Sequence, residues 1–538
     1  MKNRQYIIGF FIVFIVSIFP LLNLMTPGVP VTHDGKDHVV RIANFYASLS
    51  EGNVIPRWAQ HLNWGYGHPI LMFLYPLPSY IASLFHFLGF SFVDSTKLVF
   101  ATTYVVSGIG MYLWLSRWLG VYAGIVGALL YVFSPYRFVD LYVRGAIGEH
   151  VAFAATPFVF LGIYTLSKKR KYGTALVSVS LAALLLSHNA VSLMIVPIIL
   201  LYCVYMYKYE DVQQGFVQRI IVSVVLGMGL SSFFWIPGFL EGKYTLRDIV
   251  TDEGVAGRFV PWSWFFYSPW NYGGSNEFTK SLGVMPVFYI LISGIQHITT
   301  KGKSHVKVLL AWCLSLVLIT LFLMTDQSSF VWASVSMLKK FQFPWRLLAV
   351  TTLVLSVTGA VVVSRFKRSV IWLLVLTFFV SIGTTFHMWH AKGYQEYDEA
   401  YFTSVYEGTT DTGESSPIWS VRFMEQTPKA RIETIEGNGN IKELERSSTS
   451  RRYLVEAMTP MRLVENTLYF PGWNVSVNGE NVVTQFQDPR WRGLMTFMVP
   501  SGSSQIDIAF NDTKVRSFSL FTTLLSIILL VIYLVKPI

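Results

Sequence analysis

The chain has 538 residues, of which 53% are hydrophobic and 16% aromatic, and its apolar residues come in blocks long enough to cross a membrane. Its net charge of +11 would suggest nucleic-acid binding in a soluble protein, but in so apolar a chain Lys and Arg mark cytoplasmic loops and lipid surfaces, so we expect no nucleic-acid partner. Cys203 and Cys313 both lie inside apolar blocks, which argues against a disulfide framework and a thiolate metal site. The composition therefore indicates a multi-pass protein of the lipid bilayer.

Thirteen apolar runs follow one another along the chain. Most are about 20 residues long, the length that a membrane-spanning helix needs. They cover 6–25, 70–90, 96–116, 120–136, 148–167, 173–188, 191–207, 217–240, 281–299, 306–325, 345–363, 369–388 and 517–535.

The basic residues between these runs predict which runs cross the membrane, because cytoplasmic loops are enriched in Lys and Arg. The run at 70–90 contains Pro76 and Pro78, so we place it outside the membrane core or re-entrant within one long outer loop, 26–95. About 12 transmembrane helices then remain, with both termini in the cytoplasm. The basic groups that this topology places inside are Lys2 with Arg4, Arg117, 168–171, Lys208 with Arg219, 301–307, 365–368 and Lys536.

The C-terminal quarter has a different pattern. Residues 389–516 contain short stretches of alternating polar and apolar residues, and Asn478-Gly479 separates two of them, as in a β-hairpin. We predict a helical membrane domain over 1–388, an extracytoplasmic β-sandwich over 389–516, and a last span with a cytoplasmic tail over 517–538. The predicted fold class is thus an all-α polytopic membrane protein that carries one outer β-domain.

A dense group of ionisable residues follows the first apolar run. His33, Asp34, Asp37, His38 and Arg41 lie within nine residues, and on a helix the two acids would project from one side. Ionisable groups beside a membrane are costly unless they are paired or functional. We interpret Asp34 as a general base, with Asp37 as a supporting acid and the two histidines and Arg41 in support. The alternative is a solvated loop that caps a helix.

A second charged group lies at the predicted outer ends of later helices. Arginine makes paired, charge-assisted bonds to phosphate oxygens, so the arginines of this group are candidate phosphate ligands. Arg137 and Arg144 are seven residues apart, which is two turns of an α-helix. The alternative is that these side chains extend to lipid head groups. The whole group comprises Arg137, Asp140, Arg144, Glu149, His188 and Arg346.

Several short motifs give the chain a family resemblance. A first set comprises Gly65-Tyr66-Gly67-His68-Pro69, Tyr75-Pro76-Leu77-Pro78-Ser79-Tyr80, Ser134-Pro135-Tyr136-Arg137 and Tyr142-Val143-Arg144-Gly145, and a second set comprises Phe343-Pro344-Trp345-Arg346 and Tyr469-Phe470-Pro471-Gly472-Trp473. The first set resembles bacterial membrane proteins labelled "6-pyruvoyl-tetrahydropterin synthase-related", which are similar to the GT-C glycosyltransferase superfamily. The second set is similar to YfhO-type membrane proteins.

The resemblance implies a GT-C-like fold and an inverting sugar transfer from a polyprenyl-phosphate donor to a glycan, lipid or polymer acceptor on the outer face. It implies that Asp34 takes the proton from the acceptor hydroxyl, and that the arginines stabilise the leaving phosphate. Glu149 or Asp140 would be the second acid, which orients the acceptor or holds a divalent cation such as Mg²⁺ or Mn²⁺. The metal stays open, because Asp34-Gly35-Lys36-Asp37 departs from a plain Asp-x-Asp pair. The β-domain would bind the acceptor.

Two other functions are compatible with a polytopic chain of this kind. A flippase or transporter of lipid-linked saccharide typically has charged groups and broken helices at the bilayer midplane, often within two repeats. The charges here are predicted at one surface, and the sequence has no visible repeat. A non-catalytic scaffold of the cell envelope, whose β-domain binds wall polymer, is the third possibility.

Overall fold

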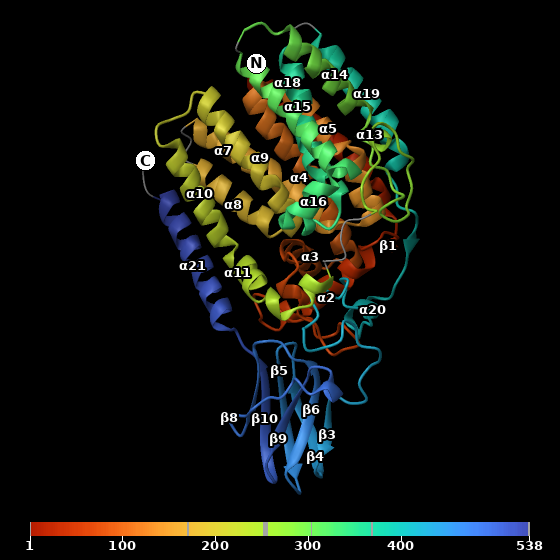
Figure 1. Cartoon of the computed structure of the whole chain (residues 1–538), viewed down its shortest axis with the longest axis vertical. Helices are drawn as coiled ribbons and strands as arrows, with labels where there is room; N and C mark the ends of the chain where they lie inside the picture. Colours follow the sequence, from red (N-terminus) through yellow and green to blue (C-terminus); the bar gives the residue numbers. More distant parts are fainter. Residues whose placement is uncertain (1, 169–171, 251–256, 303, 367–368, 536–538) are drawn as a thin grey trace.

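The computed structural model describes residues 2–168, 172–250, 257–302, 304–366 and 369–535. A bundle of helices forms one part of the molecule, and a β-sandwich extends from one end of it (Figure 1). Seven of the basic residues used to predict the topology lie outside the described residues, namely Lys169, Arg170, Lys171, Lys303, Lys367, Arg368 and Lys536.

Among the described residues, eight helices are long and apolar enough to cross a membrane. Two further pairs, bent by 47° and 71°, raise the number to ten if each pair is one span. The eight are α1 with η1 (Arg4–Met25), α4 (Phe92–Leu119), α7 (Ile147–Ser167), α9 (Asn189–Tyr209), α15 (His305–Met324), α18 with η6 (Pro344–Ser364), α19 with η7 (Val370–Met388) and α21 (Lys514–Val535). The bent pairs are α5 (Val121–Val132) with Pro135–Arg144, and α10 (Phe216–Leu230) with α11 (Ser232–Leu240).

The prediction of about 12 spans exceeds this number because two predicted spans are short. The apolar helices α8 (Gly173–Leu185) and α14 (Val284–Thr299) have 13 and 16 residues. A straight crossing takes about 20 residues, so length and composition support eight to ten spans. The excluded run at 70–90 forms only η2 (Pro69–Met72) and the 11-residue α3 (Leu77–Phe87). Its prolines interrupt it as predicted.

Helix α2 (Gly35–Ser50) lies between the bundle and the β-sandwich (Figure 1). The Thr32 hydroxyl accepts a hydrogen bond from the Gly35 N–H at 3.1 Å, and Asp37 is in the first turn, where a negative charge complements the helix dipole. The apolar residues of α2 recur at helical spacing and are buried, which holds the helix against its neighbours. They are Val39, Val40, Ile42, Ala43 and Phe45.

The β-sandwich consists of two antiparallel sheets, with strand orders β4-β5-β10-β7-β8 and β3-β6-β9. The predicted hairpin is present: Val477 pairs with Glu480, and Asn478 and Gly479 have φ angles of 52° and 86°, as a type I′ turn requires. The strands are β3 (Ile432–Glu436), β4 (Gly439–Arg446), β5 (Ser450–Ala457), β6 (Met461–Leu468), β7 (Trp473–Val477), β8 (Glu480–Asn481), β9 (Leu494–Val499) and β10 (Gly502–Phe510).

The segment 389–431 precedes the first strand of the sandwich and runs along α2. It contains β2 (Tyr394–Gln395), which pairs with β1 (Val29–Pro30), and α20 (Glu399–Thr403). We call this segment the strap, because it joins the helical part to the sandwich and contacts α2 on the way. Other short helices fill connections elsewhere, namely η4 (Gly242–Tyr244), α12 (Arg247–Val250), α13 (Trp262–Phe266), η5 (Asp326–Ser328), α16 (Ser329–Ser334), α17 (Ser336–Lys339) and η8 (Pro489–Trp491).

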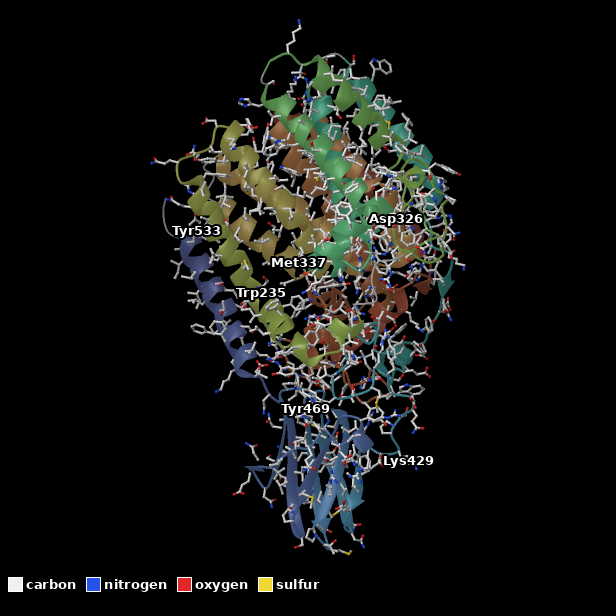
Figure 2. All side chains as sticks on the ribbon, viewed as in Figure 1. Trp235, Asp326, Met337, Lys429, Tyr469 and Tyr533 are labelled. Atoms are coloured by element: carbon white, nitrogen blue, oxygen red, sulfur yellow. The ribbon has the colours of Figure 1, made fainter. Side chains whose placement is uncertain are left out.

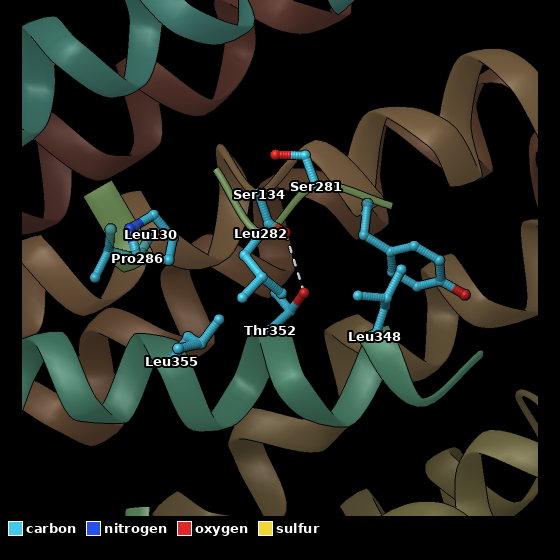
Figure 3. A pocket seen from close by; sticks show the side chains of 9 residues that line it. Leu130, Ser134, Ser281, Leu282, Pro286, Leu348, Thr352 and Leu355 are labelled. Carbon is cyan, nitrogen blue, oxygen red and sulfur yellow. Dashed lines mark hydrogen bonds between the residues drawn. The ribbon is translucent and has the colours of Figure 1, made fainter. Parts of the chain in front are cut away.

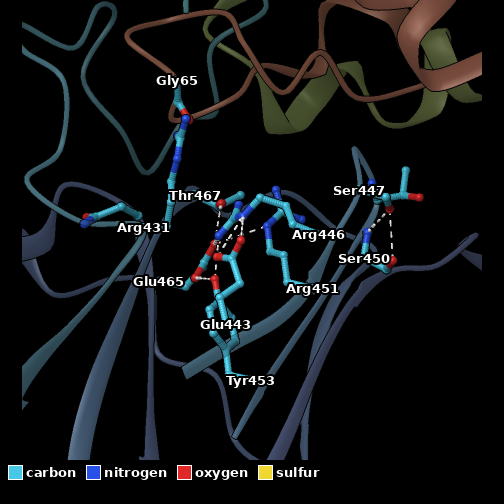
Figure 4. A network of polar contacts seen from close by, with 12 residues as sticks. Gly65, Arg431, Glu443, Arg446, Ser447, Ser450, Arg451, Tyr453, Glu465 and Thr467 are labelled. Atoms are coloured by element: carbon cyan, nitrogen blue, oxygen red, sulfur yellow. Dashed lines mark hydrogen bonds and ion pairs between the residues drawn. The ribbon is translucent and has the colours of Figure 1, made fainter. Parts of the chain in front are cut away.

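The sandwich is packed onto the loop that follows α2, which the sequence predicts to be part of the first outer loop. Trp58 and Tyr66 are buried in the same apolar cluster as the sandwich core, and the Trp58 ring lies 5.3 Å from that of Trp473, edge to face. Arg431 donates a hydrogen bond to the Gly65 carbonyl at 2.6 Å, at the end of the sandwich drawn in Figure 4. The outer loop is therefore part of the core of the β-domain.

Polar and aromatic contacts complete this junction. Buried Glu465 accepts a hydrogen bond from Tyr453 at 2.7 Å and pairs with Arg446 and Arg451 at 3.2 and 3.1 Å (Figure 4). The ring of Tyr469, at the end of the sandwich that faces the helices (Figure 2), lies 5.4 Å from that of Trp419 in the strap. Helices, strap and sandwich thus meet around one set of packed side chains.

Candidate active site

The centre of the site is a buried carboxylate, Glu149, in the first turn of α7. Its Oε1 atom is 2.8 Å from Arg144 Nη2 and 3.4 Å from Arg346 Nε. Its Oε2 atom accepts a hydrogen bond from the Tyr136 hydroxyl at 2.7 Å. Its side chain has no exposed surface, and a buried charge of this kind is stable only when it is paired. Glu149 therefore holds the two arginines in place.

Several contacts fix the position of the Arg144 guanidinium. Its Nη1 atom donates to Asp140 Oδ1 at 2.5 Å, and its guanidinium lies 4.6 Å from the centre of the Trp345 ring. Together with the pair to Glu149, these contacts occupy both terminal nitrogens and one face of the guanidinium. Arg144 is therefore positioned to set the local charge more than to rotate toward a ligand.

A π-helix separates the two arginines that the sequence placed on one helical face. Residues Val139–Arg144 form this wider helix, and Gly145 ends it with a φ angle of 69°. Because a π turn holds more residues than an α turn, Arg137 points into the bundle instead of toward Glu149. It donates to the Ser107 hydroxyl at 3.2 Å and has no exposed surface. Arg137 therefore does not lie beside Arg144 at Glu149, and its role in binding phosphate stays a prediction.

Three helices begin at the site. Glu149 is in the first turn of α7, His188 is the N-cap of α9, and Arg346 is in the η6 turn that leads into α18. The N-terminus of a helix carries partial positive charge, so three converging N-termini favour an anion. All three lie at the end of the bundle that faces α2.

His188 and Arg346 retain donors that a ligand can use. The His188 Nδ1 atom accepts a hydrogen bond from the Val191 N–H at 3.2 Å, so in the neutral ring the proton is on Nε2, which lies 4.0 Å from Glu149. Arg346 Nη1 donates to the Phe341 carbonyl and to Gln342 at 3.0 and 2.8 Å. Among the described residues, no partner occupies Arg346 Nη2.

Asp34 is brought beside these arginines by backbone contacts. The N–H groups of His33 and Asp34 donate to the carbonyls of Val143 and Arg144 at 3.0 and 2.9 Å. The Asp34 side chain is exposed, yet the surrounding protein desolvates it and raises the pKa of its carboxyl. The positive charges of Arg144, Arg41, His33 and Arg346 oppose this shift. An accessible carboxylate with raised proton affinity is suited to accept a proton.

The remaining residues of the acidic group face the strap. The Tyr406 hydroxyl donates to Asp37 Oδ1 at 2.6 Å, and Arg41 Nε donates to the Thr410 hydroxyl at 3.2 Å. His38 is buried and accepts a hydrogen bond from Arg41 at 3.0 Å; burial holds the pKa of His38 well below its usual range, so its ring is neutral. Asp37 thus binds the strap through Tyr406.

One cation of this region was not predicted from the sequence. Lys280 is buried, with its Nζ atom 3.7 Å from the centre of the Phe278 ring, and the Phe278 ring lies 5.0 Å from that of Trp345. Burial, with the charge of Arg144 nearby, lowers the pKa of Lys280 to about 7. A single lysine between an aromatic loop and α14 carries no sequence signal that distinguishes it from a surface residue.

The charged side chains do not provide a ready metal site. Among the described residues, no group of three or more His, Cys, Asp or Glu is arranged to hold a metal ion. Glu149 and Asp140 are already paired with arginines, which leaves Asp34 as the accessible acid. The donor set therefore does not fit Mg²⁺ or Mn²⁺ held by protein ligands alone.

A small cavity lies behind Tyr136. Figure 3 shows its lining, including Leu348 and the hydrogen bond of 3.0 Å between the hydroxyls of Ser134 and Thr352. Its volume of about 10 Å³ is room for about one water molecule. It is too small for a sugar and belongs to the packing beneath Glu149.

Comparison with known proteins places the chain in a family. Residues 71–390 match the family described as "6-pyruvoyl-tetrahydropterin synthase related domain; membrane protein", over more than half of the chain. The chain belongs to this family. The membership confirms the family resemblance seen in the sequence motifs, and the protein is a membrane protein. The matched region includes Arg144, Glu149, His188 and Arg346, while Asp34 precedes it.

One relative of this chain is an uncharacterized protein of Lactococcus lactis subsp. cremoris (strain MG1363). It is 26% identical over 306 residues, which are 53% of this chain and 49% of that protein. The matched part is thus about half the length of the relative.

Two solved membrane proteins resemble part of the fold. The mycobacterial arabinofuranosyltransferase AftD aligns with 73% of this chain and 27% of its own, at 14% identity and a TM-score of 0.46. The Archaeoglobus fulgidus oligosaccharyltransferase aligns with 77% of this chain and 61% of its own, at 12% identity and a TM-score of 0.42. Similarity at this level identifies no substrate.

Proposed function

We propose that the protein transfers a sugar from a polyprenyl-phosphate carrier to a hydroxyl group of a glycan, lipid or polymer acceptor. The observation that carries the proposal is that an accessible acid, Asp34, lies near Arg144 and Arg346. Glu149 pairs with both arginines and holds them together. A base next to a fixed cluster of cations is what a reaction needs when it removes a proton and releases a phosphate.

In the proposed reaction, the acceptor oxygen attacks the anomeric carbon from the face opposite the phosphate. The bond from that carbon to the phosphate oxygen breaks, and the phosphate leaves with the bonding electrons, so the anomeric configuration inverts. Asp34 takes the proton of the acceptor hydroxyl. Arg346 Nη2 and His188 Nε2 donate to the departing phosphate, and Arg144 adds positive charge from its fixed place.

Asp34, which precedes α2, contacts the backbone of Arg144 at the site, and this supports an acceptor that arrives from the side of α2 and the sandwich. We place this side outside the cell, with both termini in the cytoplasm. Helix α1 begins, and α21 ends, on the side of the bundle away from the sandwich (Figure 1). The described basic residues Lys168, Lys301 and Arg365 follow the C-terminal ends of α7, α14 and α18. Positively charged loops favour the cytoplasm. The β-domain would hold the acceptor above the site.

The test is the substitution Asp34→Asn. It keeps the shape of the side chain and removes the base, so transfer should fall by a factor of about 10² to 10⁴. Mass spectrometry of surface glycans from cells that carry either protein measures the result. We expect the variant to lack one hexose or N-acetylhexosamine unit that the wild type adds.

The matched control is Asp94→Asn, because Asp94 lies in the first turn of α4, is exposed and pairs with Lys97 at 3.6 Å. It should leave the glycans unchanged. Full transfer by a folded Asp34→Asn variant would exclude Asp34 as the base. A scaffold would tolerate Asp34→Asn but lose its function when the outer domain is deleted.

A further inference from the structure

Tyr75 lies at the site, although no functional role follows from its sequence context. It follows η2 and precedes Pro76 at the start of α3, in the interruption of the apolar run at 70–90. Its ring stacks on the imidazole of His188, with centroids 5.0 Å apart and an angle of 29° between the planes. The interruption therefore brings an aromatic ring from the first outer loop against the N-terminus of α9.

The phenol end of this ring lies against Gly148, the residue that precedes Glu149 in the chain. A Cβ atom added to Gly148 would be 2.3 Å from both Cε2 and Cζ of Tyr75. Real contacts of this kind are never so short, so Gly148 is required for the ring to reach this position. Cζ carries the hydroxyl, which consequently lies near the first turn of α7.

The hydroxyl of Tyr75 is surrounded by the charges of the site. Arg41, Asp34, Glu149 and Arg346 all act on it, and burial raises its pKa to about 12. The group thus remains a neutral donor at physiological pH. Among the residues that the structure describes, its hydroxyl has no hydrogen-bond partner, whereas the Tyr136 hydroxyl is bound to Glu149 at 2.7 Å.

We infer that Tyr75 donates a hydrogen bond to the phosphate of the lipid carrier, as the third donor beside His188 and Arg346. The inference rests on the proposed function and names the groups that bind its phosphate. A phosphate oxygen is the acceptor that fits, because His188 fixes the ring from one side and three helix N-termini favour an anion at this place. Glu149 cannot serve instead, since its two oxygens are occupied by Arg144, Arg346 and Tyr136.

The experiment compares the binding of farnesyl phosphate and farnesol to the full chain in nanodiscs of neutral lipid. The two probes share the isoprenoid chain, so the ratio of their dissociation constants reports on the phosphate alone. Tyr75→Phe keeps the ring on His188 and removes only the hydroxyl. We expect this ratio to fall by about tenfold or more, as for a lost hydrogen bond to a charged group.

The control variant is Tyr80→Phe, which also loses one hydroxyl but lies outside the site, where that group donates to the Val54 carbonyl at 2.7 Å. It should bind both probes as the wild type does. If the wild type prefers the phosphate and Tyr75→Phe, with an unchanged melting temperature, prefers it equally, the role of Tyr75 is excluded and the proposed function stands. If the wild type does not prefer the phosphate, both are excluded.

Gly148→Ala provides a second variant that changes the same contact from the other side. The added methyl group displaces the phenol and leaves the hydroxyl in the protein. We expect the preference for phosphate to fall as in Tyr75→Phe. A Gly148→Ala variant that folds and retains the full preference would contradict the position assigned to the hydroxyl.

Discussion

At the scale of single residues, the titration of Asp34 links activity and stability. Desolvation by the surrounding protein raises the pKa of Asp34, so the folded protein holds this proton more tightly than the unfolded chain. Transfer should therefore decline as the pH falls through a value above that of an ordinary aspartate, about 3.9. The pH dependence of kcat/KM measures this value. An acid limb at or below the ordinary pKa would contradict the environment described for Asp34.

The raised pKa of Asp34 also predicts how folding stability depends on pH, and this dependence runs opposite to that of activity. The contribution of Asp34 to stability is present when it is protonated and is lost as the pH rises through its raised pKa, because the ionised carboxyl is then desolvated. Asp34→Asn should accordingly gain melting temperature relative to the wild type at pH 7 but not at low pH. Calorimetry at both pH values checks the sign.

Glu149 behaves differently because it is fully enclosed. Glu149→Gln leaves Arg144 and Arg346 without their shared partner, and an uncompensated buried charge costs about 3–5 kcal/mol. We expect a large loss of thermal stability in addition to a loss of transfer. Glu407→Gln, at an exposed position in the strap, is the matched control and should unfold as the wild type does. Equal stability of the two variants would contradict the bridging role of Glu149.

The sequence indicated which residues the structure would bring together at the candidate site, but not how their side chains are arranged. Residue type and position at predicted helix ends were sufficient to select Asp34, Arg144, Glu149, His188 and Arg346, since charged groups in an apolar chain are conspicuous. The spacing of Arg137 and Arg144 did not predict their directions, because it assumed an α-helix where Val139–Arg144 form a π-helix. The position of Tyr75 at the site could not be predicted, since its contact with Gly148 joins segments more than 70 residues apart.

At the scale of elements, the turn between the π-helix and α7 positions Asp34. Gly145 has a φ angle of 69°, and a Cβ atom there would lie 2.4 Å from the Thr32 hydroxyl. Gly145→Ala therefore adds about 1–2 kcal/mol of backbone strain and displaces the turn that carries Asp34. We expect transfer to be lost, as measured by glycan mass spectrometry.

The substitution Gly52→Ala separates the effect of backbone strain from the effect of displacing the turn. Its φ angle is 94°, but nothing lies within 4 Å of an added Cβ atom. Gly52→Ala should show the loss of stability without the loss of transfer. If both variants transfer sugar normally, the contact between Thr32 and Gly145 does not position the base.

Elements differed in how well they could be predicted. Long apolar runs gave the spanning helices, and prolines gave the interruption at 70–90, because both follow from local composition. The prediction included the segment 389–431 in the β-sandwich and missed its path along α2, since its partners there are more than 350 residues away in the chain. The same distance hid the role of Asp37, which binds Tyr406.

At the scale of the whole molecule, one buried ion pair joins the last span to the bundle. Glu241, which follows α11, is 2.9 Å from Arg516 in the first turn of α21, and Arg516 has no exposed surface. Glu241→Gln should destabilise the protein by about 3–5 kcal/mol and loosen the sandwich relative to the bundle. Hydrogen exchange of β6 and β10 measures the loosening. Glu456→Gln, exposed on β5, is the control, and equal exchange in the two variants would contradict the role of the pair.

The position of Trp58 has a consequence for biosynthesis. This residue emerges from the ribosome long before the strands of the sandwich, yet it is part of their core, together with Trp473. The loop that carries Trp58 follows α2. The packing of this loop against the sandwich is therefore completed only after nearly the whole chain has been translated and inserted. A truncated nascent chain would consequently leave this loop without its partners, and the proposed sugar transfer would begin only after the strands of the sandwich have been added.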